Sequence, residues 1–211
     1  MTRLFRLFHH LFGWLYTTKP KSVLPFKNIP LWIADLFFLI WDLLLVDKIF
    51  HFFQALLGFK KRELNDREHS ILESIFESSI EYSKVRMYSD IGPFISRRAY
   101  AFVLFNTINY SKSIKDDVLV HEGVHIWQYQ RYGSPYILRA LLAQISKDKY
   151  DYGGIEKLYE GMLKGKQLVD FNFEQQGDII QHSFLQLKGI RGVNNQFYTA
   201  VYRYYLTQLD Y

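Results

Sequence analysis

The 211-residue chain is predicted to fold as a mainly helical α+β domain preceded by an apolar helical segment. Three observations predict this class. Several segments place apolar residues at helical spacing between capping residues. Residues 87–110 are instead rich in β-branched and aromatic residues, which predicts one or two strands of a small antiparallel sheet. Residues 31–59 are apolar almost throughout.

The composition excludes several classes of protein. Hydrophobic residues make up 49% of the chain and aromatic residues 18%, which excludes general disorder. The chain has no cysteine, so disulfides, cysteine-based metal sites and cysteine nucleophiles are excluded. Any metal must therefore be held by histidines and carboxylates. No basic stripe or nucleic-acid motif follows the front segment, so we expect no nucleic-acid partner.

The charge of the chain is distributed unevenly. Residues 1–62 hold nine Lys or Arg against three Asp, a net charge of +6, whereas the remaining 149 residues sum to −1. This division predicts a basic, apolar helical segment over residues 1–62 that attaches the protein to a membrane surface or a partner. Residues 63–211 are predicted to form the domain that carries the chemistry. The oligomeric state is left open.

The first 16 residues predict an amphipathic helix in which Arg3 and Arg6 lie near one stripe. Such a helix can lie among the headgroups of an anionic membrane or dock on the protein's own core, and both interpretations stay open. A secretory signal is disfavoured because His9 and His10 interrupt the apolar stretch and no clean cleavage site follows. A peripheral position on the cytoplasmic side of a membrane is one option for the location.

Residues 31–59 are not expected to form a simple transmembrane span. Asp35, Asp42 and Asp47 leave no charge-free window of about 20 residues. Asp35 and Asp42 are seven residues apart and therefore share a helical stripe. This pattern suits a helix at a membrane surface, or one packed in a core or oligomer contact with its polar groups on one side. Insertion is disfavoured because an unpaired Asp is costly in hydrocarbon.

The remaining elements follow from capping and turn residues. Asn65 or Asp66 can begin one helix, Gly133 can end another, and Asn172 with Gln175 makes a capping-box-like start for a third. We expect a main strand over about residues 100–110, a polar loop over residues 147–154, and helices over residues 65–85, 114–132, 135–146, 173–188 and 194–209.

The predicted helix over residues 114–132 contains His121, Glu122 and His125 in the pattern H-E-x-x-H. Residues four apart lie on one helix face, so both imidazoles can bind one Zn²⁺. Glu122 lies beside that metal and can act as general base on a metal-bound water in peptide hydrolysis. The strand before the helix can offer its edge to a peptide substrate. Trp127 and Gln128 are interpreted as packing and polar support.

A catalytic zinc site has three protein ligands, and the best downstream carboxylate is Glu174, with Asp178 one helical turn later. This combination of H-E-x-x-H and E-x-x-x-D resembles the gluzincin, or thermolysin-like, zinc metallopeptidases. The resemblance covers less than half of the chain and implies a zincin-like domain. It further implies that His121, His125 and Glu174 bind zinc, that Glu122 is the base, and that Asp178 orients His121.

The chain contains H-E-x-x-H-x-W-Q followed by E-Q-Q-x-D. In these residues it resembles, more loosely, small bacterial H-E-x-x-H proteins of contractile injection or polymorphic-toxin systems. Thermolysin-like enzymes stabilise the oxyanion with a later His and Tyr. Here His182 is the candidate oxyanion or substrate contact, beside several tyrosines without a diagnostic motif: Tyr198, Tyr202, Tyr204 and Tyr205. The alternatives are a non-catalytic metal-binding or structural component of a secretion or toxin assembly, and a membrane-surface interaction protein with incidental histidines.

Overall fold

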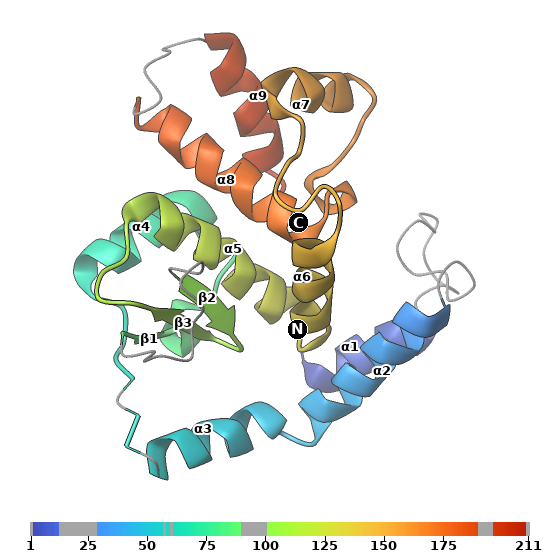
Figure 1. Ribbon diagram of the computed structural model, residues 1–211, viewed down its shortest axis with the longest axis vertical. Helices are drawn as coiled ribbons and strands as arrows, with labels where there is room; N and C mark the ends of the chain where they lie inside the picture. Colours follow the sequence, from blue (N-terminus) through green and yellow to red (C-terminus); the bar gives the residue numbers. More distant parts are fainter. Residues whose placement is uncertain are drawn as a thin grey trace.

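The computed structural model describes residues 2–12, 29–56, 58–59, 61–89, 101–189 and 196–209. These residues form a mainly helical structure with a small sheet, which confirms the predicted α+β class (Figure 1). In chain order the elements are α1 (Arg3–Phe12), α2 (Ile29–Leu43), α3 (Val46–Leu56), α4 (Asp66–Phe76), β1 (Arg86–Tyr88), β2 (Ala101–Leu104), β3 (Thr107–Tyr110), α5 (Asp116–Tyr132), α6 (Pro135–Ile145), α7 (Gly154–Leu163), α8 (Phe173–Leu187) and α9 (Gln196–Leu206).

The small sheet was expected to be antiparallel, which holds for the pair of β2 and β3, whereas β1 adds in parallel and makes the sheet mixed. Its strand order is β1-β3-β2, with β1 parallel and β2 antiparallel to β3. The expected single strand over residues 100–110 is a hairpin, because the chain turns at Phe105, whose φ is 55°. Phe105 is not a typical turn residue, and Asn106 is followed by Thr107 and not by the glycine of an Asn-Gly turn. Among the strands of the described residues, this order leaves β2 at an edge of the sheet.

Helix α5 is held between α4 and the sheet on one side and α8 on the other (Figure 1). Its contact with α4 is close because Gly123 has no side chain. A Cβ at Gly123 would lie 2.6 Å from Phe76 Cε2 and 2.7 Å from Leu72 Cδ2. Both of these residues are fully buried, so the contact lies inside the main hydrophobic core.

Several helix boundaries confirm the capping residues read from the sequence. Asn65 and Asn172 each form a complete capping box, and Gly133 ends α5 with a φ of 78°. Helix α4 is shorter than expected and ends at Phe76, after which the chain leads into β1. Helix α7 was not predicted, because it begins after Gly153 without a side-chain cap.

The front helices direct their acids toward the body of the protein. Asp35 of α2 forms an ion pair with Arg139 of α6. Asp42 accepts hydrogen bonds from the backbone nitrogen and the hydroxyl of Ser134, at 2.9 and 2.6 Å, and lies 3.7 Å from Arg6. The shared stripe predicted for Asp35 and Asp42 is therefore the buried face of α2.

The apolar segment is divided into α2 and α3, which are bent by 59° relative to each other. Among the described residues, no helix by itself has the length and apolar composition to cross a membrane, whereas the bent pair together meets both criteria. The division at residue 62 and the attachment of the front to a membrane or partner stay predictions. Residues 13–16 of the expected first helix lie outside the described residues.

We expect Asp42→Ala to lower the free energy of unfolding by about 2–4 kcal/mol, because both Ser134 donors and Arg6 lose a buried acceptor. Urea unfolding followed by circular dichroism measures the change. The exposed residue Asp148 provides the control, and Asp148→Ala should change stability by less than about 0.5 kcal/mol. Equal small effects of both substitutions would show that Asp42 does not anchor α2.

Candidate metal centre

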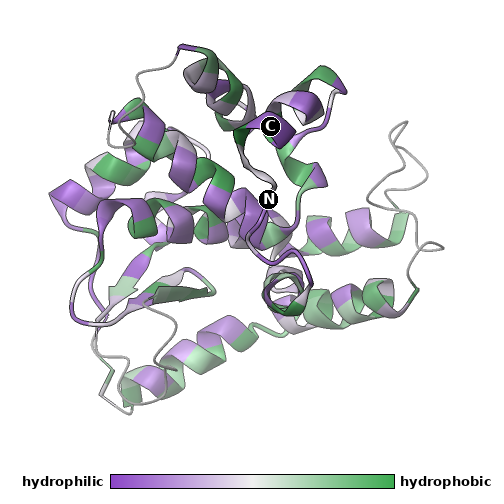
Figure 2. Cartoon of the chain, turned by 45° about the horizontal axis from the view of Figure 1, so that its top comes forward, coloured by the Kyte–Doolittle hydropathy of each residue, from purple (hydrophilic) through white to green (hydrophobic). Residues whose placement is uncertain are grey.

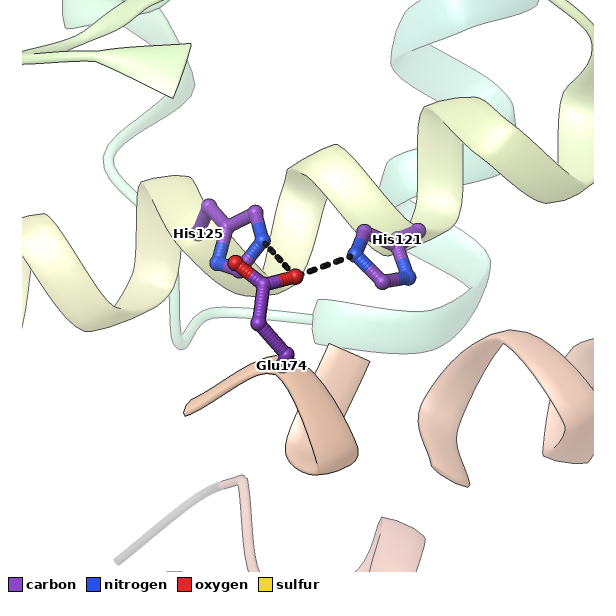
Figure 3. A group of neighbouring side chains, drawn as sticks. All are labelled: His121, His125 and Glu174. Atoms are coloured by element: carbon purple, nitrogen blue, oxygen red, sulfur yellow. Dashed lines mark ion pairs between the residues drawn. The ribbon is translucent and has the colours of Figure 1, made fainter. Parts of the chain in front are cut away.

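The three predicted ligands converge where α5 contacts α8 (Figure 3). His121 Nε2 and His125 Nε2 each lie 3.5 Å from Glu174 Oε2, and one ligand atom from each residue lies within 4.8 Å of the other two. The histidines come from one face of α5 and Glu174 from the first turn of α8. All three are buried, and Glu174 is only 1% exposed. This group can hold a metal ion.

A glycine allows α8 to approach the ligands. A Cβ at Gly177 would lie 2.6 to 2.9 Å from three ring atoms of His121. Glycine within a helix costs about 1 kcal/mol relative to alanine, so its use here is explained by this close approach. Gly177 was not among the predicted site residues, although its place between Glu174 and Asp178 is the sequence signal that could have marked it.

A chain of amides determines which nitrogen of His125 is protonated. Gln128 Nε2 donates to the carbonyl of Phe173, at 3.1 Å, and to Gln176 Oε1, at 2.9 Å. Gln176 in turn donates to the carbonyl of Phe171. Because a carbonyl can only accept, Gln128 Oε1 faces His125 Nδ1, 2.8 Å away, and that nitrogen carries the hydrogen. The Nε2 lone pair is therefore directed to Glu174, and Gln128 supplies the predicted polar support.

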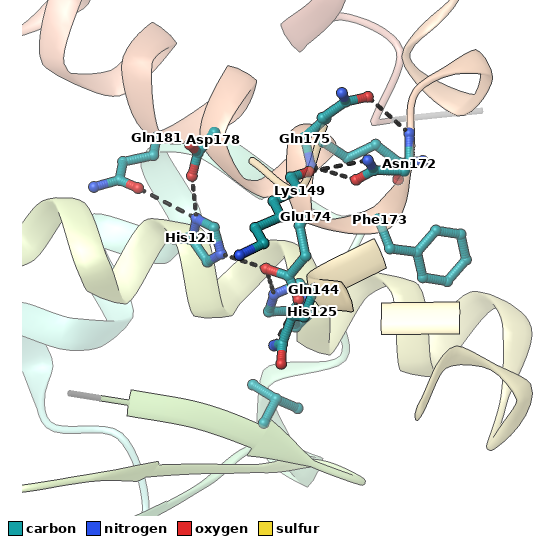
Figure 4. Close-up of polar contacts among 12 residues, drawn as sticks. His121, His125, Gln144, Lys149, Asn172, Phe173, Glu174, Gln175, Asp178 and Gln181 are labelled. Carbon is teal, nitrogen blue, oxygen red and sulfur yellow. Dashed lines mark hydrogen bonds and ion pairs between the residues drawn. The ribbon is translucent and has the colours of Figure 1, made fainter. Parts of the chain in front are cut away.

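His121 is oriented in the same way by residues of two helices (Figure 4). Asp178 Oδ1 lies 3.1 Å from His121 Nδ1, and Gln181 Oε1 lies 3.2 Å from it. Gln181 Nε2 donates to Asp117, a carboxylate that accepts only, so the amide oxygen of Gln181 faces the histidine. His121 Nδ1 is thus a donor, and Nε2 is left for a ligand bond.

The surrounding acids favour a positive charge at this point. Burial by itself would lower the pKa of His121, because it disfavours the charged imidazolium. Hydrogen bonds with Asp178 and Glu174 outweigh this effect and raise the pKa of His121 to about 10. Burial would likewise raise the pKa of Glu174, but contacts with His121 and His125 outweigh it and hold that pKa well below its usual range. A metal cation among these ligands would supply positive charge at the same place.

Glu122 lies on the same helix between the two histidines and is buried. Its Oε2 atom has no hydrogen-bond partner among the described residues. Burial, as the largest effect, raises the pKa of its carboxyl group. A buried oxygen without a partner is costly in a folded protein, and such positions are enriched at functional sites.

A cavity of about 620 Å³ opens beside Asp178 and extends along α8. His182 lies in its wall and is not part of the ligand group. Its Nδ1 is 2.5 Å from the hydroxyl of Tyr152, which is 3.1 Å from that of Tyr202. Tyr198 also lines the cavity. Two of the four candidate tyrosines, Tyr198 and Tyr202, therefore line the same cavity as His182.

Two tyrosines that were not predicted contact the ligand histidines. The ring of Tyr136 lies 5.5 Å from that of His125, and its hydroxyl donates to the carbonyl of Val103 on β2. The ring of Tyr150 lies 6.1 Å from that of His121. Burial and the neighbouring Glu174 raise the pKa of Tyr150. Tyr150 belongs to the polar loop before α7, where no sequence motif marked it.

No protein-family model matches the chain, and no solved structure matches it. The chain is similar to the type VI secretion system spike protein VgrG2b of Pseudomonas aeruginosa, with 27% identity over 154 residues. The match covers 64% of this chain and 14% of the length of the spike protein. It agrees with the looser resemblance to proteins of contractile injection systems. The gluzincin resemblance stays a prediction.

We expect Gly177→Ala to weaken zinc binding by about 10- to 100-fold, because the new methyl group displaces the His121 ring from its supporting contacts. Competition with a chromophoric chelator measures the affinity. Gly161→Ala is the control, since its Cβ would approach Tyr205 Oη at 3.0 Å, away from the ligands. Unchanged zinc affinity in Gly177→Ala would contradict the role of this close approach.

Proposed function

We propose that the protein is a zinc-dependent peptide hydrolase that binds its metal through His121, His125 and Glu174. The observation that carries this proposal is the buried group of two imidazoles and one carboxylate next to Glu122, whose Oε2 has no partner among the described residues. Either feature alone also fits a structural metal site. Together they supply the ligands and the proton acceptor that metal-assisted hydrolysis requires.

The donor set of the three ligands fits zinc. Two imidazole nitrogens and one carboxylate oxygen are a donor set that catalytic zinc sites use. His121 and His125 use Nδ1 as a donor, so Nε2 is the nitrogen that each turns toward Glu174 and that would bind the metal, with release of any proton it carries. When bound, zinc supplies a Lewis acid that polarises a peptide carbonyl and lowers the pKa of water to about 7.

Glu122 is the residue that transfers the proton in this proposal. Its raised pKa makes it a stronger base than an ordinary carboxylate, and its unpartnered oxygen is available to accept. It takes a proton from the attacking water as the water oxygen bonds to the carbonyl carbon. It then gives that proton to the amine nitrogen as the carbon–nitrogen bond breaks. Glu122 returns to its starting state.

The edge strand β2 supports a peptide as the substrate. Tyr136 packs on His125 and hydrogen-bonds the carbonyl of Val103, so one side chain joins the strand edge to the ligand group. The main chain of an extended peptide can add to such an edge by hydrogen bonding.

The cavity beside Asp178 supports a binding site for a substrate side chain. We assign Tyr150, ahead of His182, to contact substrate at the metal, because the Tyr150 ring lies against His121. His182 forms a hydrogen bond with Tyr152 in the wall of the cavity, where it would contact the substrate side chain. The sequence offered His182 as a candidate oxyanion or substrate contact, and these assignments give it the substrate contact and add Tyr150.

The second candidate function is a non-catalytic, metal-binding component of a secretion assembly. The similarity of the chain to a spike protein of a type VI secretion system favours it. This candidate needs the three ligands but has no use for Glu122. The two functions therefore differ in what a substitution of Glu122 would change.

We expect Glu122→Gln to lower kcat/KM for an unfolded protein substrate such as casein by at least about 100-fold, because the amide cannot accept the proton. Its zinc content, measured by mass spectrometry, should equal that of the unsubstituted protein. Glu160→Gln changes an exposed acid on α7 and should leave both quantities unchanged. Equal hydrolysis by Glu122→Gln would rule out the mechanism, whereas zinc binding without hydrolysis by the unsubstituted protein would favour the second candidate.

The ligand assignment is tested by Glu174→Ala beside Glu156→Ala and Glu160→Ala. Glu174 is buried at the ligand group, whereas the other two acids lie on the exposed side of α7. Isothermal titration with zinc should show affinity at least about 100-fold weaker for Glu174→Ala, since one of three ligands is lost. Similar zinc affinities in all three variants would show that Glu174 is not a ligand.

A further inference from the structure

Helix α2 carries its apolar side chains outward and its acids inward. Its buried residues are Asp35, Leu39 and Asp42. The opposite side of the segment exposes a row of large apolar side chains at helical spacing: Ile29, Ile33, Phe37, Ile40, Trp41 and Leu44. A helix on the surface of a water-soluble domain has the reverse arrangement, with its apolar stripe buried and its charges exposed.

Helices α1 and α3 show the same arrangement. Arg3 of α1 pairs with Asp47 of α3 at 2.6 Å, and Arg6 lies close to Asp42 of α2. Phe50 of α3 packs on Phe105 of the body, with ring centroids 5.6 Å apart. The sides turned away from these contacts expose two further rows: Leu4, Phe5, Phe8 and Phe12 on α1, and Ile49, Phe52, Phe53 and Leu56 on α3.

These three rows are called the outer face. In Figures 1 and 2, α2 and α3 follow one another along one edge of the molecule, and α1 packs beside α2. The largest exposed apolar patch on a typical soluble monomer is about 300–600 Å² and is often functional. The rows of exposed Phe, Ile and Leu on three helices therefore indicate that the outer face binds an apolar partner.

The charges of the front segment indicate what that partner is. Its acids and the two arginines of α1 are turned inward, toward one another and the body. The remaining basic residues, apart from Arg62 at the end of the segment, are lysines. Lys61 faces inward, with its Nζ 2.5 Å from His51 Nδ1. The other five lie before α2, early in α3 and after α3: Lys19, Lys21, Lys27, Lys48 and Lys60. Lysines on both sides of an apolar segment can place their ammonium groups among lipid headgroups.

We propose that the outer face is immersed in one leaflet of a lipid bilayer, with α1–α3 lying in the plane of the membrane. The inward ion pairs of Arg3 with Asp47 and of Arg6 with Asp42 keep these charges away from the hydrocarbon, which is the arrangement charged residues take inside membranes. The bend of 59° between α2 and α3 suits helices that follow the surface. This inference does not depend on the metal centre.

A bilayer fits the outer face better than a protein partner does. Specific protein interfaces combine an apolar centre with a polar rim and are enriched in arginine. Both arginines of α1 are instead turned toward the other front helices and the body. Apolar side chains without a polar pattern match a fluid hydrocarbon layer, which needs no directional contacts.

Flotation of the full chain with vesicles tests the proposal. We expect it to float with vesicles of pure phosphatidylcholine, and to do so equally in about 0.5 M NaCl, because apolar immersion is not screened by salt. Leu56→Glu should reduce the bound fraction at least about tenfold at the same lipid concentration. Leu163→Glu is the matched control, since Leu163 on α7 is 68% exposed and Leu56 is 71% exposed.

Both variants change exposed residues, and thermal unfolding by circular dichroism checks that they remain folded. Binding that requires phosphatidylglycerol and disappears in high salt would overturn the proposal, because the lysines alone would then account for it. Equal loss of binding in Leu56→Glu and Leu163→Glu would also overturn it. A third outcome would also overturn it: the protein does not bind vesicles, is a dimer in sedimentation velocity, and becomes a monomer when it carries Leu56→Glu. The outer face would then be a contact between two copies.

Discussion

The close approach of α8 to α5 is the constraint on which the metal centre depends. Gly177 leaves room for the ring of His121, and the two helices thereby bring Glu174 within 3.5 Å of both imidazoles. On its opposite side α5 is held equally closely, where Gly123 admits the side chains of α4. Because α5 is packed from both sides, the ligands are positioned by the core itself and not by a flexible loop.

Helix α6 connects this centre to the front of the protein. Its Arg139 pairs with Asp35 of α2, its Tyr136 packs on His125, and its Gln144 donates to Glu174 Oε1 at 2.9 Å. The same helix therefore binds the inward side of the front helices and supports two of the ligands. A membrane-bound front and a metal-binding body would in this way be held in a fixed relation to each other.

The amides around the histidines show where prediction from the sequence ends. Gln128 was interpreted as polar support from its position in H-E-x-x-H-x-W-Q, and it serves as one. Its partner Gln176 and the second amide, Gln181, were not foreseen, because their partners on α5 are 48 and 64 residues away in sequence. A glutamine in a helix has no local pattern that reveals such a partner.

The sequence by itself determined the features that depend on local order. Helical periodicity put His121 and His125 on one face, capping residues began α4 and α8, and the lack of cysteine limited the ligands to histidines and carboxylates. Only the tertiary structure decided the hairpin at Phe105, the uncapped start of α7, and the side to which Asp35 turns. The hairpin and the start of α7 carry no strong local turn or capping signal. The direction of Asp35 depends on Arg139, 104 residues away, and a period of 3.6 residues contains no information about which segment a helix face will meet.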